Sequence, residues 1–332
     1  MINKNIILIA DRINKYNEDN ILFSKTYEKI PNEYFHNLYN ALSTISNRIT
    51  HYQTPEDFLE NIEKHKNEFV ISLWSGENSR NRKSLIPSIC EAYGLMYLGA
   101  DCYVQTISQD KNLSKVFCQE VNILTPRSKL LYNLESLNLI NDLSLPLIVK
   151  PNFEGGSIGI SQENLVYNYT DAKNITKKLL EVFKQPILIE EFIEGDEISF
   201  VVGGNSDNLF LEAIRLYSNE INLKQNIMSY ELKKLKNINI ERELYTQNIE
   251  MELIKKIKNL YFKLGKVNLI RIDGRIKNNK FYCIELSPDV NLNSSSTVAT
   301  AFQLKGFSYS EALEEIINLS IESDLYQNAS KT

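Results

Sequence analysis

The 332-residue chain has three histidines and four cysteines, and this scarcity argues against several common kinds of site. His36, His51 and His65 all fall in the first fifth of the sequence with no other catalytic signature beside them, so a histidine-based hydrolytic triad is not expected. The cysteines at positions 90, 102, 118 and 283 show no CxxC spacing, which argues against a zinc site and against a disulfide framework.

Long apolar runs and an excess of positive charge are also missing. No stretch approaches the roughly 20 apolar residues that cross a bilayer, and the apolar part of MINKNIILIADR is too short for a signal peptide. We therefore expect this segment to be the first strand of a cytoplasmic protein that has no membrane partner. The net charge of −5, without clustered Lys and Arg, argues against a nucleic-acid partner.

Strands and helices alternate over residues 1–100, which predicts a small parallel α/β domain. The expected elements are the strands IILIA and FVISLW and helices near residues 33–48, 55–65 and 84–93. The first strand is not followed by GxGxxG, so the dinucleotide-binding fingerprint is missing. A chain of this length can form two or three packed domains.

Two further groups of elements follow, over residues 101–190 and 191–332. The first has a helix near 108–120, strands near 127–131 and 146–150, a helix near 171–183 and the strand ILIEEF. The second opens with the strands EISFVVGG and NLFLEAIRLY, which the turn-forming GGNSDN joins. A helix near 247–264 then keeps helical apolar spacing up to Gly265.

The stretch VKPNFEGGSIGI, residues 149–160, ends an apolar run at a lysine and then has three glycines within five residues. Because glycine has no Cβ, such a loop lets the backbone approach a ligand closely, and phosphate is the first candidate. A surface hairpin is the alternative, and this stretch alone does not decide between the two.

A β-hairpin is expected over residues 269–287, with a three-residue turn from Asn278 to Lys280. In that register Asp273 lies opposite Glu285 and Arg271 opposite Ser287, all on one face. The other face is predicted to be buried and carries Ile270, Ile272, Ile276, Ile284 and Leu286.

Two carboxylates that face each other repel unless a positive charge lies between them. Mg²⁺ suits this position because it takes oxygen ligands, usually one or two carboxylates with phosphate and water. A two-residue turn would put Asp273 and Glu285 on opposite faces, so the inference depends on the register. The alternative is an exposed Arg-Asp-Glu cluster that serves solubility.

The glycine loop, the strand ILIEEFIEGDEISF and the R-x-D…I-E hairpin occur in this order, and together they resemble the ATP-grasp superfamily, and within it the D-alanine:D-alanine ligase family. The resemblance covers roughly residues 95–315. It implies an α/β (α+β) ATP-grasp fold of three domains, 1–100, 101–190 and 191–332, with ATP held between the central and C-terminal domains and Mg²⁺ on carboxylates of the last.

The resemblance implies that Lys111 and Lys150 contact ATP phosphates and that the loop from Glu154 to Gly159 folds over the triphosphate. Residues 190–193 would form a strap around adenine, and Glu197 would accept ribose hydroxyls; an ordinary β-strand with an acidic edge is the alternative for this segment. The implied cofactor-binding residues are Lys111, Lys150, Glu154, Gly155, Gly156, Ser157, Glu190, Glu191, Phe192, Ile193, Glu197 and Lys233.

The segment IMSYELKKLK resembles the family's mobile loop, whose lysine, here Lys233, reaches the terminal phosphates when the loop closes. The implied catalytic residues are Arg271, Lys233, Ser157 and Asn291. The implied substrate residues are Tyr230, Lys234, Arg271 and Ser296, and the implied metal ligands are Asp273, Glu285 and Ser287.

The implied reaction is activation followed by capture. A substrate carboxylate attacks the γ-phosphate of ATP to give an acyl phosphate, and an amine then displaces phosphate to form an amide. The substrates are then small carboxylates and amines such as amino acids or short peptides, and a homodimer would follow family habit alone.

Several positions depart from the family's pattern. Ser287 replaces an asparagine metal ligand, Asn291 replaces a glycine whose N–H helps bind the oxyanion, Gly156 replaces a loop serine and Lys234 replaces its tyrosine partner. ADRINKYNEDN also lacks the glycine-rich, Glu-containing signature that grips the first D-alanine.

These departures gather around the two amino-acid subsites, so we predict a specialised ligase with non-standard substrates that makes a small peptide or secondary metabolite. Three alternatives stay open. They are the D-alanine:D-alanine ligase of cell-wall synthesis, a non-catalytic ATP-binding regulatory protein, and a phosphoryl transferase that stops at the phosphate.

Overall fold

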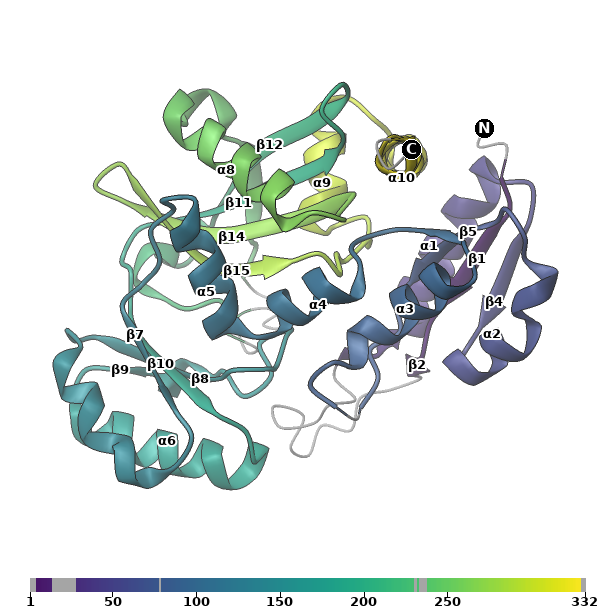
Figure 1. Ribbon diagram of the computed structural model, residues 1–332. Coiled ribbons are helices and arrows are strands. Elements are labelled where there is room, and N and C mark those ends of the chain that lie inside the picture. The colour runs from purple at the N-terminus through teal and green to yellow at the C-terminus, as the bar shows by residue number, and fades with distance from the viewer. Residues whose placement is uncertain (1–3, 14–27, 78, 230–231, 233–237, 330–332) are drawn as a thin grey trace.

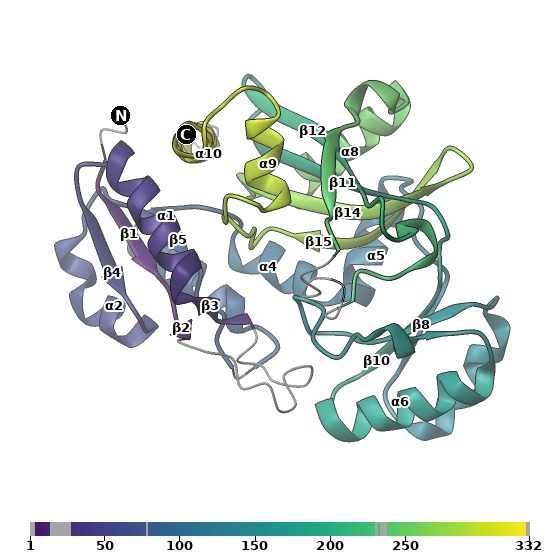
Figure 2. The ribbon, with the colours of Figure 1, turned by 180° about the vertical axis from the view of Figure 1, so that it is seen from behind.

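The computed structural model describes residues 4–13, 28–77, 79–229, 232 and 238–329, and Figure 1 shows their arrangement. Three larger sheets follow one another along these described parts, and a short pair, β2 (Arg12–Ile13) and β3 (Ile30–Pro31), accompanies the first. Helices pack against each larger sheet, as the opposite view also shows (Figure 2). Among the described residues no helix is long and apolar enough to cross a membrane.

The first sheet is parallel, with the strand order β4-β1-β5-β6. Its strands are β1 (Ile6–Ile9), β4 (Ile49–Tyr52), β5 (Phe69–Ser72) and β6 (Met96–Tyr97), and its helices are α1 (Asn32–Ile45), α2 (Pro55–Asn61), η3 (Ile62–Lys64), η4 (Arg82–Ser84) and α3 (Leu85–Ala92). The parallel α/β elements predicted for this part are confirmed, whereas the domain boundary at residue 100 stays a prediction.

The continuous apolar run of β1 follows from burial on both faces of this sheet. Ile6 and Leu8 pack in one core cluster with residues of α1, while Ile7 and Ile9 pack in another with residues of α2 and α3. Strand β1 is therefore fully buried and holds the first sheet together.

The helix predicted near residues 108–120 is confirmed as α5 (Lys111–Glu120), and a second helix that was not predicted, α4 (Cys102–Gln109), precedes it. Asp110 separates them: its backbone is extended, and its carboxylate accepts hydrogen bonds from the N–H groups of Asn112 and Leu113 at 3.1 and 3.0 Å. This cap makes Lys111 the first residue of α5.

The second sheet is antiparallel, with the order β7-β10-β8-β9, and α6 lies on one face of it. Its elements are β7 (Ser128–Leu131), η5 (Leu134–Asp142), β8 (Leu147–Pro151), η6 (Gln162–Asn164), β9 (Leu165–Val166), α6 (Tyr169–Phe183) and β10 (Ile187–Glu191). The strands and the helix predicted for this part are confirmed. The glycine loop leaves the end of β8.

The third sheet is antiparallel, with the order β13-β12-β11-β14-β15. Its strands are β11 (Asp196–Gly204), β12 (Leu209–Tyr217), β13 (Glu241–Leu244), β14 (Leu269–Lys277) and β15 (Lys280–Ser287). The accompanying helices are η7 (Leu223–Gln225), η8 (Thr246–Asn248), α8 (Met251–Leu264), α9 (Thr297–Gln303) and α10 (Tyr309–Ala329). Gly265 ends α8, as predicted.

Helix α10 joins the first and third parts of the molecule. Its residues Ile316 and Ile317 belong to the same core cluster as Leu38 and Leu42 of α1 and Val201 of β11. In both views α10 lies between the first sheet and the third (Figures 1 and 2). The two ends of the described chain therefore share one core.

The predicted turn of the β14–β15 hairpin is wrong, although Asp273 does face Glu285 and Arg271 does face Ser287. Lys277 pairs with Lys280, so the turn has two residues, Asn278 and Asn279, both with positive φ. The register then shifts by one residue between Asp273 and Gly274. This β-bulge restores the pairing that a two-residue turn alone would have lost.

The bulge also changes which residues of β15 are buried. Phe281 and Cys283 join the core, as does Leu286 on the far side of the bulge, whereas Ile284, predicted to be buried, is half-buried. A Cβ at Gly274 would overlap the Tyr282 carbonyl oxygen and the Phe281 ring. Only glycine fits at the position where the strand shifts its register.

Gly274→Ala should therefore destabilise the protein by about 1–3 kcal/mol, because backbone has to move to admit the methyl group. Urea unfolding measures the effect. Gly203→Ala is the matched control, because there the new Cβ would first meet the side-chain end of Leu269 at 3.0 Å, and we expect a smaller loss. Equal unfolding midpoints for wild type and Gly274→Ala would refute the steric account.

Candidate active site

A buried cluster of charges lies where α5, β8 and β10 meet. Glu190 is 1% exposed, and its two carboxylate oxygens form ion pairs with Lys150 and, at 2.7 Å, with Lys115. Burial by itself would raise the pKa of Glu190, but the two ammonium groups outweigh this and lower it to about 2. Burial, together with Lys115 and Lys111, lowers the pKa of Lys150 against the effect of Glu190.

Lys111 extends this cluster to the third sheet. Its Nζ lies 3.0 Å from Oε1 of Glu285 on β15. Burial raises the pKa of Glu285, but Lys111, Lys150 and Arg271 reverse the effect and lower it to about 2. Three ammonium groups thus stand against Glu190 and Glu285, which leaves an excess of positive charge suited to an anionic ligand.

Arg271 and Asp273 form a bidentate pair beside Glu285. Nε of Arg271 donates to both oxygens of Asp273 at 2.8 and 2.9 Å, and Nη2 donates to Oδ2 at 2.8 Å. Ser199 on β11 also donates to Asp273, at 2.7 Å. Burial would lower the pKa of Arg271, but Asp273 raises it above its usual value.

Asp273 and Glu285 form a donor set that fits Mg²⁺. Each carboxylate has a cation beside it, Arg271 or Lys111, so positive charge already stabilises the pair. Hard oxygen ligands are what Mg²⁺ prefers, and it is often bound by one or two carboxylates with phosphate and water. Among the described residues no group of three His, Cys, Asp or Glu side chains could hold a metal, so a ligand would have to complete the coordination.

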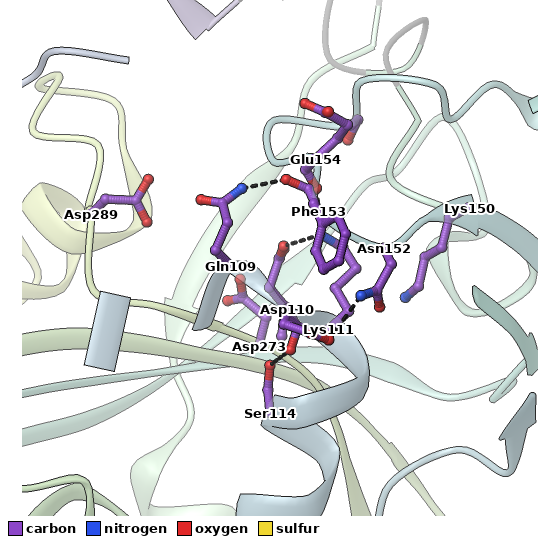
Figure 3. Close-up of polar contacts among 12 residues, drawn as sticks. Gln109, Asp110, Lys111, Ser114, Lys150, Asn152, Phe153, Glu154, Asp273 and Asp289 are labelled. Atoms are coloured by element: carbon purple, nitrogen blue, oxygen red, sulfur yellow. Dashed lines mark hydrogen bonds and ion pairs between the residues drawn. The ribbon is translucent and has the colours of Figure 1, made fainter. Parts of the chain in front are cut away.

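The start of the glycine loop is fixed to the α4–α5 junction, which Figure 3 shows in close-up. Gln109 donates to the carbonyl of Phe153, and Lys111 donates to the carbonyl of Glu154. Nδ2 of Asn152 donates to Asp110 at 2.8 Å. These bonds hold the backbone of residues 152–154 close to the buried lysines.

A charge network ties the same loop to the first part of the chain. Arg82 donates to Glu154 at 3.1 Å and to Glu28 at 2.8 Å. Lys83 pairs with Glu28 at 3.0 Å and with Asp289, which Figure 3 shows on the loop after β15. Glu154, expected at the triphosphate, therefore has its carboxylate bound to Arg82 and to Gln185.

The segment expected to strap adenine is bound at each of its residues. Oε1 of Glu191 accepts from Arg127 at 3.1 Å, and the N–H of Phe192 donates to the Pro146 carbonyl at 2.9 Å. Arg275 donates to the Ile193 carbonyl at 3.1 Å and to Glu197 at 2.8 Å. Residues 191–194 also line a cavity of about 410 Å³, which none of the three buried lysines lines.

A protein-family model described as D-ala D-ala ligase C-terminus matches residues 121–318 of the chain. The chain belongs to the D-Ala-D-Ala ligase family. The D-alanine–D-alanine ligase of Carboxydothermus hydrogenoformans is 24% identical over 86% of this chain and 91% of its own length. D-alanine–D-alanine ligase A of Bacillus cereus is 26% identical over 81% and 86%.

Solved structures of the family share the fold. The D-alanine–D-alanine ligase of Bacillus anthracis complexed with ATP superposes with a TM-score of 0.69 at 19% identity, covering 98% of this chain and 99% of that one. The VanG D-Ala:D-Ser ligase of Enterococcus faecalis gives 0.64 at 18% identity, covering 96% and 100%. The ATP-grasp fold implied by the resemblance is confirmed.

Other residues implied by the family resemblance have local structural partners. Ser157 donates to the Met228 carbonyl at 2.8 Å, and both it and Gly156 have positive φ. Ser296 caps α9 by accepting from the Ala299 N–H at 3.1 Å, and the exposed Asn291 accepts from the Asn293 N–H at 2.8 Å. Tyr230, Lys233 and Lys234 lie outside the described residues.

Two residues of the site, Lys115 and Arg275, were not predicted, although the spacing of each relative to a predicted residue is regular. Lys115 lies one helical turn after Lys111, on the same face of α5. Arg275 continues the alternation of Arg271 and Asp273 along β14. The network of Glu28, Arg82 and Lys83 had no comparable signal, since it joins segments far apart in the chain.

Glu190→Gln should cost about 3–5 kcal/mol at pH 7, because it leaves Lys115 and Lys150 buried without their carboxylate. The pKa of Glu190 is depressed in the folded protein, so its contribution is fully present above its usual value of 4.5 and is lost as pH falls toward about 2. Urea unfolding from pH 7 to pH 3 should show the two proteins converging in acid. A pH-independent difference would contradict this.

Proposed function

We propose that the protein is a ligase that joins two small, non-standard substrates, a carboxylate and an amine, into a small peptide or secondary metabolite. The family's reaction is the ADP-forming, ATP-dependent formation of a carbon–nitrogen bond, with ATP and Mg²⁺ as cofactors. The observation that carries the proposal is the facing pair Asp273 and Glu285 beside Arg271 and the buried lysines.

Each charged residue has a role in this proposal. Lys111 and Lys150 bind the phosphates of ATP, and the fixed backbone of residues 152–154 sets the path of the loop above them. Arg271 stabilises negative charge on the acyl group while the substrate carboxylate attacks the γ-phosphate. The amine then displaces phosphate from the acyl phosphate, and no side-chain nucleophile is required.

Asp273 and Glu285, with Ser287 on the same face as Arg271, would hold Mg²⁺. When bound, the ion neutralises charge on the transferring phosphoryl group. The protein's part is to keep the two carboxylates opposite each other, which the β-bulge achieves.

Non-standard substrates are supported by the residues around the substrate side of this site. Asn291 is exposed and has a side chain where the resemblance implies a glycine. The buried Arg82 and the neighbouring Lys83 place two cations beside the glycine loop, paired with Glu28, Glu154 and Asp289.

The names of the relatives support a second candidate, the joining of two D-alanines or of D-alanine to D-serine. This function requires the same ATP chemistry and differs only in the substrates that fit.

Purified protein should release phosphate from Mg-ATP only with the correct carboxylate and amine. We would screen amino acids, other carboxylates and amines, D-alanine and D-serine included, with mass spectrometry of each positive well. A product with the mass of two substrates minus water identifies the reaction. D-alanyl-D-alanine as the main product would support the second candidate, a stable phosphorylated product would indicate phosphoryl transfer, and ATP binding without release in any well would favour a regulatory protein.

Asp273→Asn and Glu285→Gln should each lower phosphate release by about 100-fold or more, because each removes charge opposite the transferring phosphoryl group. Glu120→Gln is the control, since Glu120 is an exposed carboxylate paired with Lys263 at 3.3 Å. Steady-state rates at saturating Mg-ATP measure the effect. Wild-type rates in both site variants would rule out the carboxylate pair as the metal site.

A further inference from the structure

One buried arginine connects the segments around the expected nucleotide site. Arg275 on β14 is 3% exposed and stands opposite Glu197 of β11. Its Nε donates to Oε2 of Glu197 at 2.8 Å, and its Nη2 lies 2.7 Å from the same oxygen. Its guanidinium carbon is 4.6 Å from the centre of the Phe192 ring.

The guanidinium group of Arg275 donates four hydrogen bonds and forms an ion pair with Glu197 through Nη2. Besides Glu197, Nη1 donates to the carbonyls of Ile193 and Lys224, both at 3.1 Å, and Nη2 donates to that of Asn226 at 2.6 Å. The guanidinium group offers five donors in a fixed planar fork, and a lysine ammonium has only three. Burying a charge is costly unless it is fully bonded, so this site is built specifically for arginine.

The bonds of Arg275 reach the glycine loop through one intermediate segment. That segment is residues 223–229, and Arg275 bonds to it at the carbonyls of Lys224 and Asn226. Ser157 donates a hydrogen bond to its Met228 carbonyl, and Gln162 donates one to its Ile227 carbonyl, both at 2.8 Å. Ile227 also packs with Phe192. Arg275 therefore links the strap, this segment and the glycine loop.

Arg275 also decides how Glu197 is oriented. Both of its contacts fall on Oε2, so Oε1 is not held by the arginine. The arginine thereby anchors the carboxylate at Oε2, and Oε1 can accept from another donor. A pair of ribose hydroxyls is a donor of the right chemistry, because hydroxyl groups bond strongly to carboxylate oxygens.

We propose that Arg275 is a positioning residue for the nucleotide: it orients Glu197 toward the ribose hydroxyls and holds the strap against residues 224–226. This inference rests on the proposed function, in which the protein binds ATP, and on the role at adenine that the family resemblance implies for the strap. Arg275 itself need not touch the nucleotide, so its removal should act through Glu197.

The test compares the binding of ATP and of 2′,3′-dideoxy-ATP by calorimetry with Mg²⁺ and without amino acids. Wild type should bind the dideoxy nucleotide about 10-fold or more weakly, as expected for lost bonds to a charged acceptor. Arg275→Met should weaken ATP binding and reduce this ratio to about 3-fold or less. A merely structural role would weaken both nucleotides equally and leave the ratio unchanged.

Three further variants complete the experiment. Arg215→Met is the matched control, because Arg215 lies on β12, which β11 separates from β14, and pairs with Glu243 at 2.6 Å. Its ratio of ATP to dideoxy-ATP affinity should stay that of wild type. Arg275→Lys keeps the charge without the fork and should give an intermediate ratio, which also provides the test if Arg275→Met does not fold. When Glu197→Gln is already present, adding Arg275→Lys should no longer change the ratio of ATP to dideoxy-ATP affinity, because Arg275 is proposed to act through Glu197.

The outcomes separate the two proposals. No binding of ATP to wild type would overturn the proposed function and this inference with it. Binding without discrimination between the nucleotides would leave nucleotide binding intact and refute the role of Glu197. If folded Arg275→Met or Arg275→Lys kept the wild-type ratio of ATP to dideoxy-ATP affinity, only the role of Arg275 would be refuted.

Discussion

The carboxylate of Glu190, buried between the ammonium groups of Lys115 and Lys150, is the interaction on which the candidate site depends. A charge removed from water must be paired, so burying Glu190 forces a helix and two strands to meet at one place. Lys111, one helical turn before Lys115, then reaches Glu285 of the third sheet. The second and third sheets are thus held at a spacing that the charges set.

A second constraint comes from the backbone of the β14–β15 hairpin. The two asparagines of the turn favour positive φ and a two-residue connection, which by itself puts Asp273 and Glu285 on opposite faces. The bulge beside Gly274 inserts one residue and restores the pair. Turn, bulge and glycine act together, and the facing carboxylates are the result.

The loops around this centre are held by side chains from distant parts of the sequence. Arg82 of the first part reaches Glu154 of the glycine loop, and Arg275 gathers the strap and residues 224–226. Both guanidinium groups are buried and bonded in several directions. The loops are thereby tied to distant parts of the chain through charged hydrogen bonds.

The sequence by itself determined most strands of the three sheets, because apolar periodicity and turn residues report local structure, but it did not predict β4, β6, β9 and β13. It also indicated Asp273 and Glu285 through their pairing in the hairpin, and Lys111 and Lys150 through the family resemblance. The tertiary structure alone decided the bulge that corrected the register, because it depends on how Gly274 packs against Tyr282 and Phe281 across the hairpin. It also decided the partners of Glu154 and Glu197, since Arg82 and Arg275 are distant from them in the chain and local pattern does not encode which distant charge a buried charge meets.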